Sequence, residues 1–137
     1  MYPVIQSFLA GFPVLMLHMS VTVAMLVAAI IIYIKITPYD EIKLIRGGNT
    51  AAAVSLSGAI IGLALPLAFS MASSISVWEV LIWGPVTLTL QLIAFRITDL
   101  VLKDLPKRIV DAEMAPAILL VSIKLGAAAI NAAAVTG

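Results

Sequence analysis

The sequence contains no cysteine, which excludes disulfide bonds, thiolate chemistry and metal sites built on cysteine. Charge is also scarce: Asp, Glu, Lys and Arg make up 11% of the 137 residues, against about 25% in soluble domains. The net charge is +1 with scattered basic residues, so nothing supports nucleic-acid binding. Because 63% of the residues are hydrophobic, the composition indicates a protein whose solvent is lipid.

The groupings that enzymes need are absent as well. No pair of acids can be placed at one depth, and no nucleophile has a base beside it. The turn that ends at Asn49 is too short for a phosphate-binding loop and lacks its lysine. His18 lies between methionines, which are soft copper ligands, but a single histidine among apolar residues is more typical of packing. We therefore expect no enzymatic activity, no cofactor and no metal.

Four apolar segments are long enough to cross a bilayer, which takes about 20 helical residues. They cover about residues 13–35, 50–72, 77–100 and 115–136. Helices are expected because the runs do not alternate as barrel strands do, and because each backbone group must be paired within its own segment. The predicted fold class is an all-α integral membrane protein, with one four-helix transmembrane domain over residues 1–137.

The first twelve residues lack the positively charged start of a secretory signal, so we expect them to stay uncleaved. Their apolar residues fall at helical spacing and predict a short interfacial helix before the first span, with Pro13 restarting the chain. These residues are Val4, Ile5, Phe8, Leu9 and Phe12.

The loop charges predict the orientation. Neither terminal segment nor the loop 73–76 contains Lys or Arg. The first and third loops hold the basic residues Lys35, Lys43, Arg46, Lys103, Lys107 and Arg108, with Arg96 nearby. By the positive-inside rule both charged loops are cytoplasmic and both termini are periplasmic, in a multi-pass protein of the bacterial inner membrane.

The first loop contains turn and cap signals. Thr37, Pro38 and Asp40 resemble a capping box, with Thr37 as N-cap, Pro38 at the first helical position and Asp40 at the third. The glycine pair that ends at Gly48 would stop this short helix. Asn49 would cap the next helix and turn the chain into the membrane.

The short helix between these caps is predicted to lie on the membrane surface. Ile42 and Ile45 share its apolar face. The charged side chains are expected to point elsewhere: Glu41, Lys43 and Arg46.

An internal duplication is also indicated. A shift of 64 residues lays the first helix pair over the second without a gap, with matches that include Asp40/Asp104, Lys43/Lys107 and Gly62/Gly126. Several other matches are alanines, for which composition alone is the alternative explanation. Two parallel repeats, about residues 13–72 and 77–136, would be related by an axis along the membrane normal.

Lys124 lies deep in the fourth predicted span, where a lysine is costly. Asn131 shares its helix face, and Gln91 lies at a similar depth in the third span. One interpretation is a polar seam for an anion, a lipid headgroup or a partner's carboxylate. The other is that Lys124 snorkels or pairs at an oligomer contact while the amides bridge helices.

No carboxylate of the chain is expected to reach Lys124, because Glu79 and Asp99 lie near opposite ends of the third span. This pattern favours a partner from another chain. Arg96, Asp99 and Lys103 are interpreted as a charge ladder that anchors the topology.

Small residues form packing faces on two spans. Ser55, Gly58 and Gly62 share a face of the second span with Pro66 one turn on, and Gly126 lies on a comparable face of the fourth. In lipid, such faces let helix backbones approach closely.

A family resemblance rests on a set of short matches: Ile36-Thr37-Pro38, Glu41, Leu44-Ile45, Asn49-Thr50-Ala51-Ala52, Ser57-Gly58, Gly62 and Pro66, then Trp83-Gly84, Gln91-Leu92, Asn131-Ala132-Ala133 and Thr136. This pattern resembles the bacterial inner-membrane family DUF350, a domain of unknown function also designated UPF0719 or YjfL-like. The second half departs from it at residues 111–116, where no Gly-Asn turn repeats. The resemblance implies a four-helix membrane protein and supplies no substrate or reaction.

Two functions fit these observations. The favoured one is a non-catalytic inner-membrane protein, working as a homo-oligomer or as an accessory subunit of a larger membrane assembly. Its partners are the lipid bilayer and itself or another membrane protein, with loops 37–48 and 103–113 as cytoplasmic contact surfaces. The alternative is a small channel or transporter with a path lined by Lys124, Gln91 and Asn131.

Overall fold

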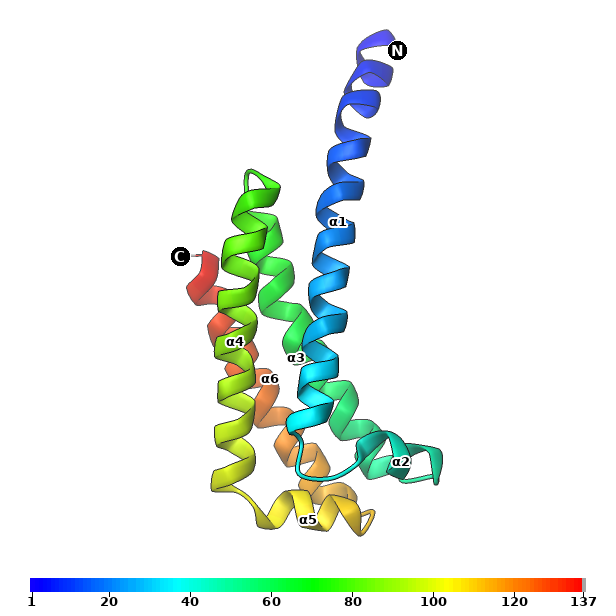
Figure 1. Cartoon of the computed structure of the whole chain (residues 1–137), viewed down its shortest axis with the longest axis vertical. Coiled ribbons are helices and arrows are strands. Elements are labelled where there is room, and N and C mark those ends of the chain that lie inside the picture. Colours follow the sequence, from blue (N-terminus) through cyan, green and yellow to red (C-terminus); the bar gives the residue numbers. More distant parts are fainter. Residues whose placement is uncertain (137) are drawn as a thin grey trace.

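The computed structural model describes residues 1–136, in which every regular element is a helix. The order is α1 (Tyr2–Ile36), α2 (Glu41–Arg46), α3 (Thr50–Ser73), α4 (Val77–Val101), α5 (Asp104–Val110) and α6 (Met114–Thr136). Four helices are long and apolar enough to cross a membrane: α1, α3, α4 and α6. The predicted all-α fold with four spans is therefore confirmed (Figure 1).

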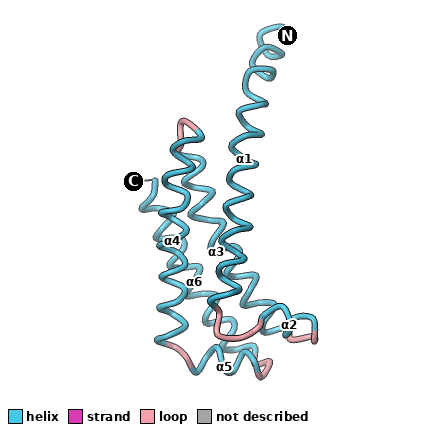
Figure 2. Tube along the Cα trace, viewed as in Figure 1, coloured by secondary structure: helices cyan, strands magenta, loops and turns pink. Residues whose placement is uncertain are grey.

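The short helices α2 and α5 lie at one end of the bundle, and both described termini lie toward the other end (Figure 1). We call the end that carries α2 and α5 the charged end, because most of the basic residues are there. Figure 2 shows how little of the chain is loop: the connections at the charged end and a single turn between α3 and α4.

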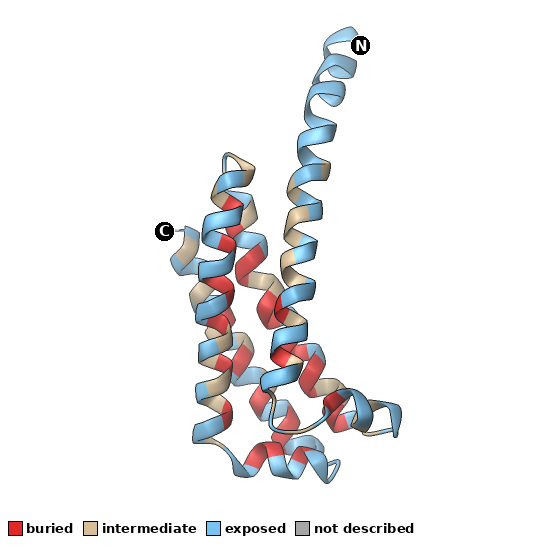
Figure 3. Cartoon of the chain, viewed as in Figure 1, coloured by how far each residue is buried: buried red, intermediate tan, exposed pale blue. Residues whose placement is uncertain are grey.

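The first helix corrects one prediction. A separate N-terminal helix was expected to end at Pro13, but α1 runs for 35 residues with Pro13 inside it. A proline removes only its own amide hydrogen bond, and apolar residues continue on both sides, so an unbroken helix keeps nearly all backbone groups paired. Ala29 and Tyr33 are the buried residues of α1, and its N-terminal half extends beyond the other helices, exposed to the surroundings (Figure 3).

The predicted N-cap of the short helix in the first loop also needs correction. Asp40, not Thr37, is the N-cap of α2, and its side chain accepts a hydrogen bond from the Lys43 amide. Thr37 instead ends α1, where its hydroxyl donates to the Tyr33 carbonyl at 2.7 Å. Placing the cap at Asp40 shortens α2 to six residues and puts Pro38 in the linker, outside the helix.

The turn into α3 is built as the residue types suggest. Gly48 has φ +93°, a left-handed conformation that glycine adopts at little cost. Asn49 caps α3 by accepting from the Ala52 amide at 3.0 Å. The side-chain Nδ2 of Asn49 also donates to the main-chain carbonyls of Ile109 and Val110 in α5. Asn49 therefore links both short helices at the charged end.

Helix α3 is the centre of the bundle and packs most extensively against α6. Its small residues make this possible: a Cβ at Gly58 would lie 2.6 Å from the Val121 side chain of α6. A Cβ at Gly62 would lie 3.7 Å from the Lys124 carbonyl of α6 and 2.7 Å from Cζ of Phe95 on α4. Ser55 and Pro66 are buried on the same helix. On α6, by contrast, Gly126 is exposed, and a Cβ added to it would meet no atom within 4 Å.

Candidate functional site

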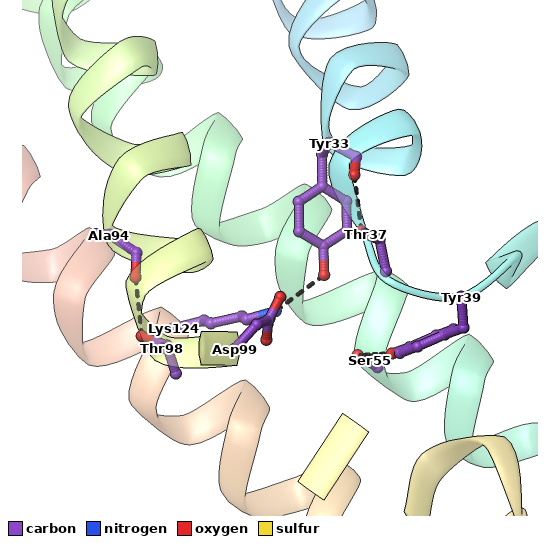
Figure 4. A network of polar contacts seen from close by, with 8 residues as sticks. All are labelled: Tyr33, Thr37, Tyr39, Ser55, Ala94, Thr98, Asp99 and Lys124. Atoms are coloured by element: carbon purple, nitrogen blue, oxygen red, sulfur yellow. Dashed lines mark hydrogen bonds and ion pairs between the residues drawn. The ribbon is translucent and has the colours of Figure 1, made fainter. Parts of the chain in front are cut away.

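The bundle encloses charged side chains near its charged end. Lys124 of α6 is 2% exposed, and its Nζ lies 3.1 Å from Oδ1 of Asp99. The same ammonium donates a hydrogen bond to the Tyr33 hydroxyl at 2.9 Å (Figure 4). It also lies 5.0 Å from the centre of the Tyr33 ring and 5.4 Å from that of Phe95. Cation–π attraction of this kind adds to the ion pair.

The expectation that no carboxylate of the chain reaches Lys124 was therefore wrong. Two geometric facts explain it. Helix α6 crosses the bundle obliquely (Figure 1), and the main-chain carbonyl of Lys124 lies 3.4 Å from Nε2 of Gln91 on α4, two helical turns before Asp99. A helical side chain also leans toward the N-terminus of its own helix, which for Lys124 is the charged end where Asp99 lies. The pair needs no second chain.

Asp99 likewise does not belong to an exposed charge ladder. It is 7% exposed and faces inward with Gln91 and Phe95. These three residues are spaced by four, which places them on one side of a helix. That spacing was visible in the sequence and could have indicated that Asp99 points into the bundle.

Glu41 is the second acid of this region, and it too was expected to point elsewhere. It is 0% exposed, and within residues 1–136 neither of its carboxylate oxygens has a hydrogen-bond partner. It begins α2 one turn before Ile45, and that face of α2 packs against α3 and the core. The i, i+4 relationship with an apolar residue was the sequence signal for its burial.

Burial raises the pKa of Glu41 from 4.5 to about 7. The positive charge of Lys124 and the neighbouring hydroxyls of Tyr33 and Thr37 act in the opposite direction, and the charge of Asp99 adds to the increase. We call Tyr33, Glu41, Asp99 and Lys124 the charged cluster. It joins α1, α2, α4 and α6, and it contains two carboxyl groups for one ammonium.

The predicted polar residues meet beside this cluster. Gln91 donates from Nε2 to the main-chain carbonyl of Lys124 at 3.4 Å. Asn131 donates from Nδ2 to Oε1 of Gln91 at 3.1 Å and to the carbonyl of Thr87 at 3.2 Å. Lys124, Gln91 and Asn131 therefore form a connected line between α4 and α6, which we call the polar seam.

A cavity of about 240 Å³ opens beside the charged cluster. Its lining includes Asp99 together with Tyr39 of the α1–α2 linker, whose hydroxyl lies 3.4 Å from that of Ser55. Three basic side chains also line it: Arg96, Lys103 and Lys107. Neither Gln91 nor Lys124 is part of this lining, so the cavity ends at Asp99.

The structure shows no candidate metal site: across residues 1–136, no three His, Cys, Asp or Glu side chains lie close enough together to hold a metal ion. The arrangement offers titration, hydrogen bonding and ion pairing.

Comparison with known proteins gives the chain's relatives. Residues 7–135 match the family described as Domain of Unknown Function (DUF350). The chain is 32% identical over 119 residues to the UPF0719 inner membrane protein YjfL of Escherichia coli strain K12, covering 87% of this chain and 90% of the relative. The protein of the same description from Escherichia coli O157:H7 matches to the same extent. No solved structure matches the chain.

Proposed function

The chain belongs to the DUF350 family of membrane proteins, and we propose that it is a non-catalytic, multi-pass inner-membrane protein that works as a homo-oligomer or as an accessory subunit of a larger membrane assembly. The family relationship and the four apolar helices support the membrane location. The small-residue surface of α6 supports the assembly.

The observation that carries this proposal is the difference between two glycines. Gly62 on α3 is covered by Phe95 inside the bundle, whereas Gly126, its counterpart 64 residues later, faces outward with open space above it. Between transmembrane helices the hydrophobic effect is weak, and close backbone approach at small residues drives association. The exposed side of α6 therefore suits a neighbouring helix from another chain.

The distribution of charge supports an orientation. Basic residues gather around α2 and α5, while the turn between α3 and α4 has none. We propose that the charged end faces the cytoplasm and that both termini are periplasmic. Fusion of a periplasm-dependent reporter enzyme to either terminus would test this orientation.

The order of elements supports the proposed repeat. Each half consists of a long helix, a short helix and a second long helix, and the starts of α3 at Thr50 and α6 at Met114 are 64 residues apart. We propose that residues 13–72 and 77–136 are two parallel copies. In the first copy the small-residue face is used inside the chain, which leaves the equivalent face of the second copy free for assembly.

The assembly is tested by placing a large side chain at Gly126. Gly126→Leu fits the monomer because its Cβ meets nothing within 4 Å, but it would hold a neighbouring helix away. We expect native mass spectrometry in mild detergent to show a larger species for the wild type and a smaller one for this variant. The matched control is an apolar enlargement on a different exposed helix, Ala24→Leu on α1. A wild-type protein that runs as a monomer without partners contradicts the proposal.

Transport is a second candidate, favoured by the continuous line of polar contacts from Asp99 through Lys124 and Gln91 to Asn131. Its test is chloride flux through reconstituted vesicles. Lys124→Met alone leaves Asp99 buried without a partner, so the double variant Asp99→Leu/Lys124→Met is the better probe. Flux that is unchanged in the double variant would exclude the seam as a path.

A further inference from the structure

We propose that the carboxylate of Glu41 is a proton-binding site, which takes up one proton from the solution at the charged end and releases it again as the pH rises. This inference is independent of the proposed assembly. It concerns a ligand for a buried group that the packing of the bundle leaves unexplained.

The first argument is the isolation of the carboxylate. Glu41 has no exposed surface, and in the described chain neither of its oxygens accepts a well-formed hydrogen bond, although the hydroxyls of Tyr33 and Thr37 are near. A buried polar group without a partner is rare and needs an explanation, and a buried carboxylate in its charged form is especially unfavourable. A proton removes the charge and needs no additional space, unlike any larger ligand.

The second argument is the balance of charge in the charged cluster. The titratable groups that face Glu41 are Tyr33 from α1, Tyr39 from the linker, Asp99 from α4 and Lys124 from α6. Helix α3, which packs on α2, carries no titratable side chain. The ammonium of Lys124 already forms an ion pair with Asp99 at 3.1 Å. A protonated Glu41 leaves the cluster neutral, whereas an ionised one leaves a buried negative charge.

The third argument is a route for the proton. The 240 Å³ cavity at the charged end reaches Asp99 and Tyr39. From Asp99 the contacts continue to Lys124 and from there to the Tyr33 hydroxyl at 2.9 Å, and this hydroxyl lies close enough to the Glu41 carboxyl to influence its pKa. A proton that leaves hydronium in the cavity can therefore end on a Glu41 oxygen, and the reverse transfer returns it to water. No oxidant or reductant takes part.

The consequence falls on α2. Glu41 is the first residue of this six-residue helix, so its carboxyl holds α2 against the bundle when neutral and disfavours that position when ionised. The pKa of about 7 that burial gives this group places the change near neutral pH. The charged end would then have two states, distinguished by one proton.

The test is infrared spectroscopy of the purified full-length protein in lipid nanodiscs during a pH titration. A buried protonated carboxyl shows a carbonyl stretching band that the ionised form lacks. We expect such a band at about pH 5, its loss with a midpoint near neutral pH, and its complete absence in Glu41→Gln. The matched control is Glu113→Gln, which removes an exposed carboxylate paired with Arg108 and should leave the band unchanged.

The assignment can also be made without altering Glu41. The chain has three glutamates: Glu41, Glu79 and Glu113. In a Glu79→Gln/Glu113→Gln background, carboxyl-labelled ¹³C-glutamate should shift the titrating band. The proposal is overturned if the wild type shows no titrating band between about pH 5 and pH 9, if the band persists in Glu41→Gln, or if the glutamate label leaves it in place. Persistence in Glu41→Gln would assign the proton to another carboxyl group, and a band that the glutamate label leaves in place would assign it to an aspartate.

Discussion

The Nζ of Lys124 and the Oδ1 of Asp99 lie 3.1 Å apart, with side chains that are 2% and 6% exposed. Helices α4 and α6, which the short helix α5 separates in the sequence, are thus joined by an ion pair inside an apolar bundle. Such a pair gives little net stability relative to apolar residues, but it is costly to break. Replacing one of the two residues should therefore have a very different effect on stability from replacing both.

Replacing one member should destabilise the bundle strongly. We expect Lys124→Met or Asp99→Leu to lower the free energy of unfolding by about 3–5 kcal/mol, because each leaves an uncompensated buried charge. The double variant Asp99→Leu/Lys124→Met should recover most of this loss. Unfolding in sodium dodecyl sulfate, followed by circular dichroism, measures all three. Additive losses in the double variant would show that the two side chains do not depend on each other.

Glu41 should make the stability depend on pH. Its pKa is 4.5 when unfolded and about 7 when buried, so between these values the folded state binds more protons than the unfolded state. By linkage, stability is highest below about pH 4.5 and falls as the pH rises toward 7. The shift corresponds to about 3 kcal/mol. We expect the melting temperature of the wild type to fall between about pH 5 and pH 8.

Two variants isolate this effect. Glu41→Gln should abolish the pH dependence in that window, because the amide does not titrate. Glu113→Gln should keep it, since hydrogen bonds from Arg108 hold the pKa of Glu113 below its ordinary value and outside the window. A slope that is equal in the wild type and in Glu41→Gln would assign the pH dependence to another group.

The glycines of α3 and α6 should respond oppositely to the same substitution. At Gly62 a Cβ would lie 2.7 Å from Cζ of Phe95, and Phe95 packs edge-on against Tyr33, so it has little freedom to move. We expect Gly62→Ala to cost about 1–3 kcal/mol by overpacking. Gly126→Ala meets open space and should leave the monomer unchanged or slightly more stable. Comparing the unfolding curves of both variants in detergent decides this; an equal gain in both would show that helix propensity and not packing governs.

The spans could be predicted from the sequence because the length and hydropathy of a segment are local properties. The cap at Asn49 was equally local. The charged cluster could not be predicted in the same way, because the contact between Lys124 and Asp99 depends on the oblique crossing of α6 and α4. For Glu41 the one sequence signal was its i, i+4 relationship with Ile45, and the opposite expectation was stronger. A charged residue on a short surface helix is normally solvated, and the packing of α2 on α3 is what buries Glu41.

Helix α1 shows that a local sequence signal can also mislead. Pro13 predicts a boundary because proline usually ends helices in water. In a long apolar segment the alternative to helix is an unpaired backbone in lipid, which is more costly than one missing hydrogen bond. The surrounding lipid therefore outweighs the local preference of proline.

Asn49 should be the most sensitive residue of the loops at the charged end. Its side chain caps α3 at the Ala52 amide, and its amide holds the last carbonyls of α5 at Ile109 and Val110. Loss of a cap costs about 1 kcal/mol, and the two carbonyl bonds add to that, so we expect Asn49→Ala to cost about 2 kcal/mol or more. Asn49→Asp separates the two roles, because aspartate accepts at the cap but cannot donate to α5. Hydrogen exchange of α5 should rise in both variants, whereas exchange at the start of α3 should rise in Asn49→Ala alone. If Asn49→Asp leaves α5 as protected as the wild type, then the two carbonyl bonds do not hold that helix, and the cap alone explains the role of Asn49.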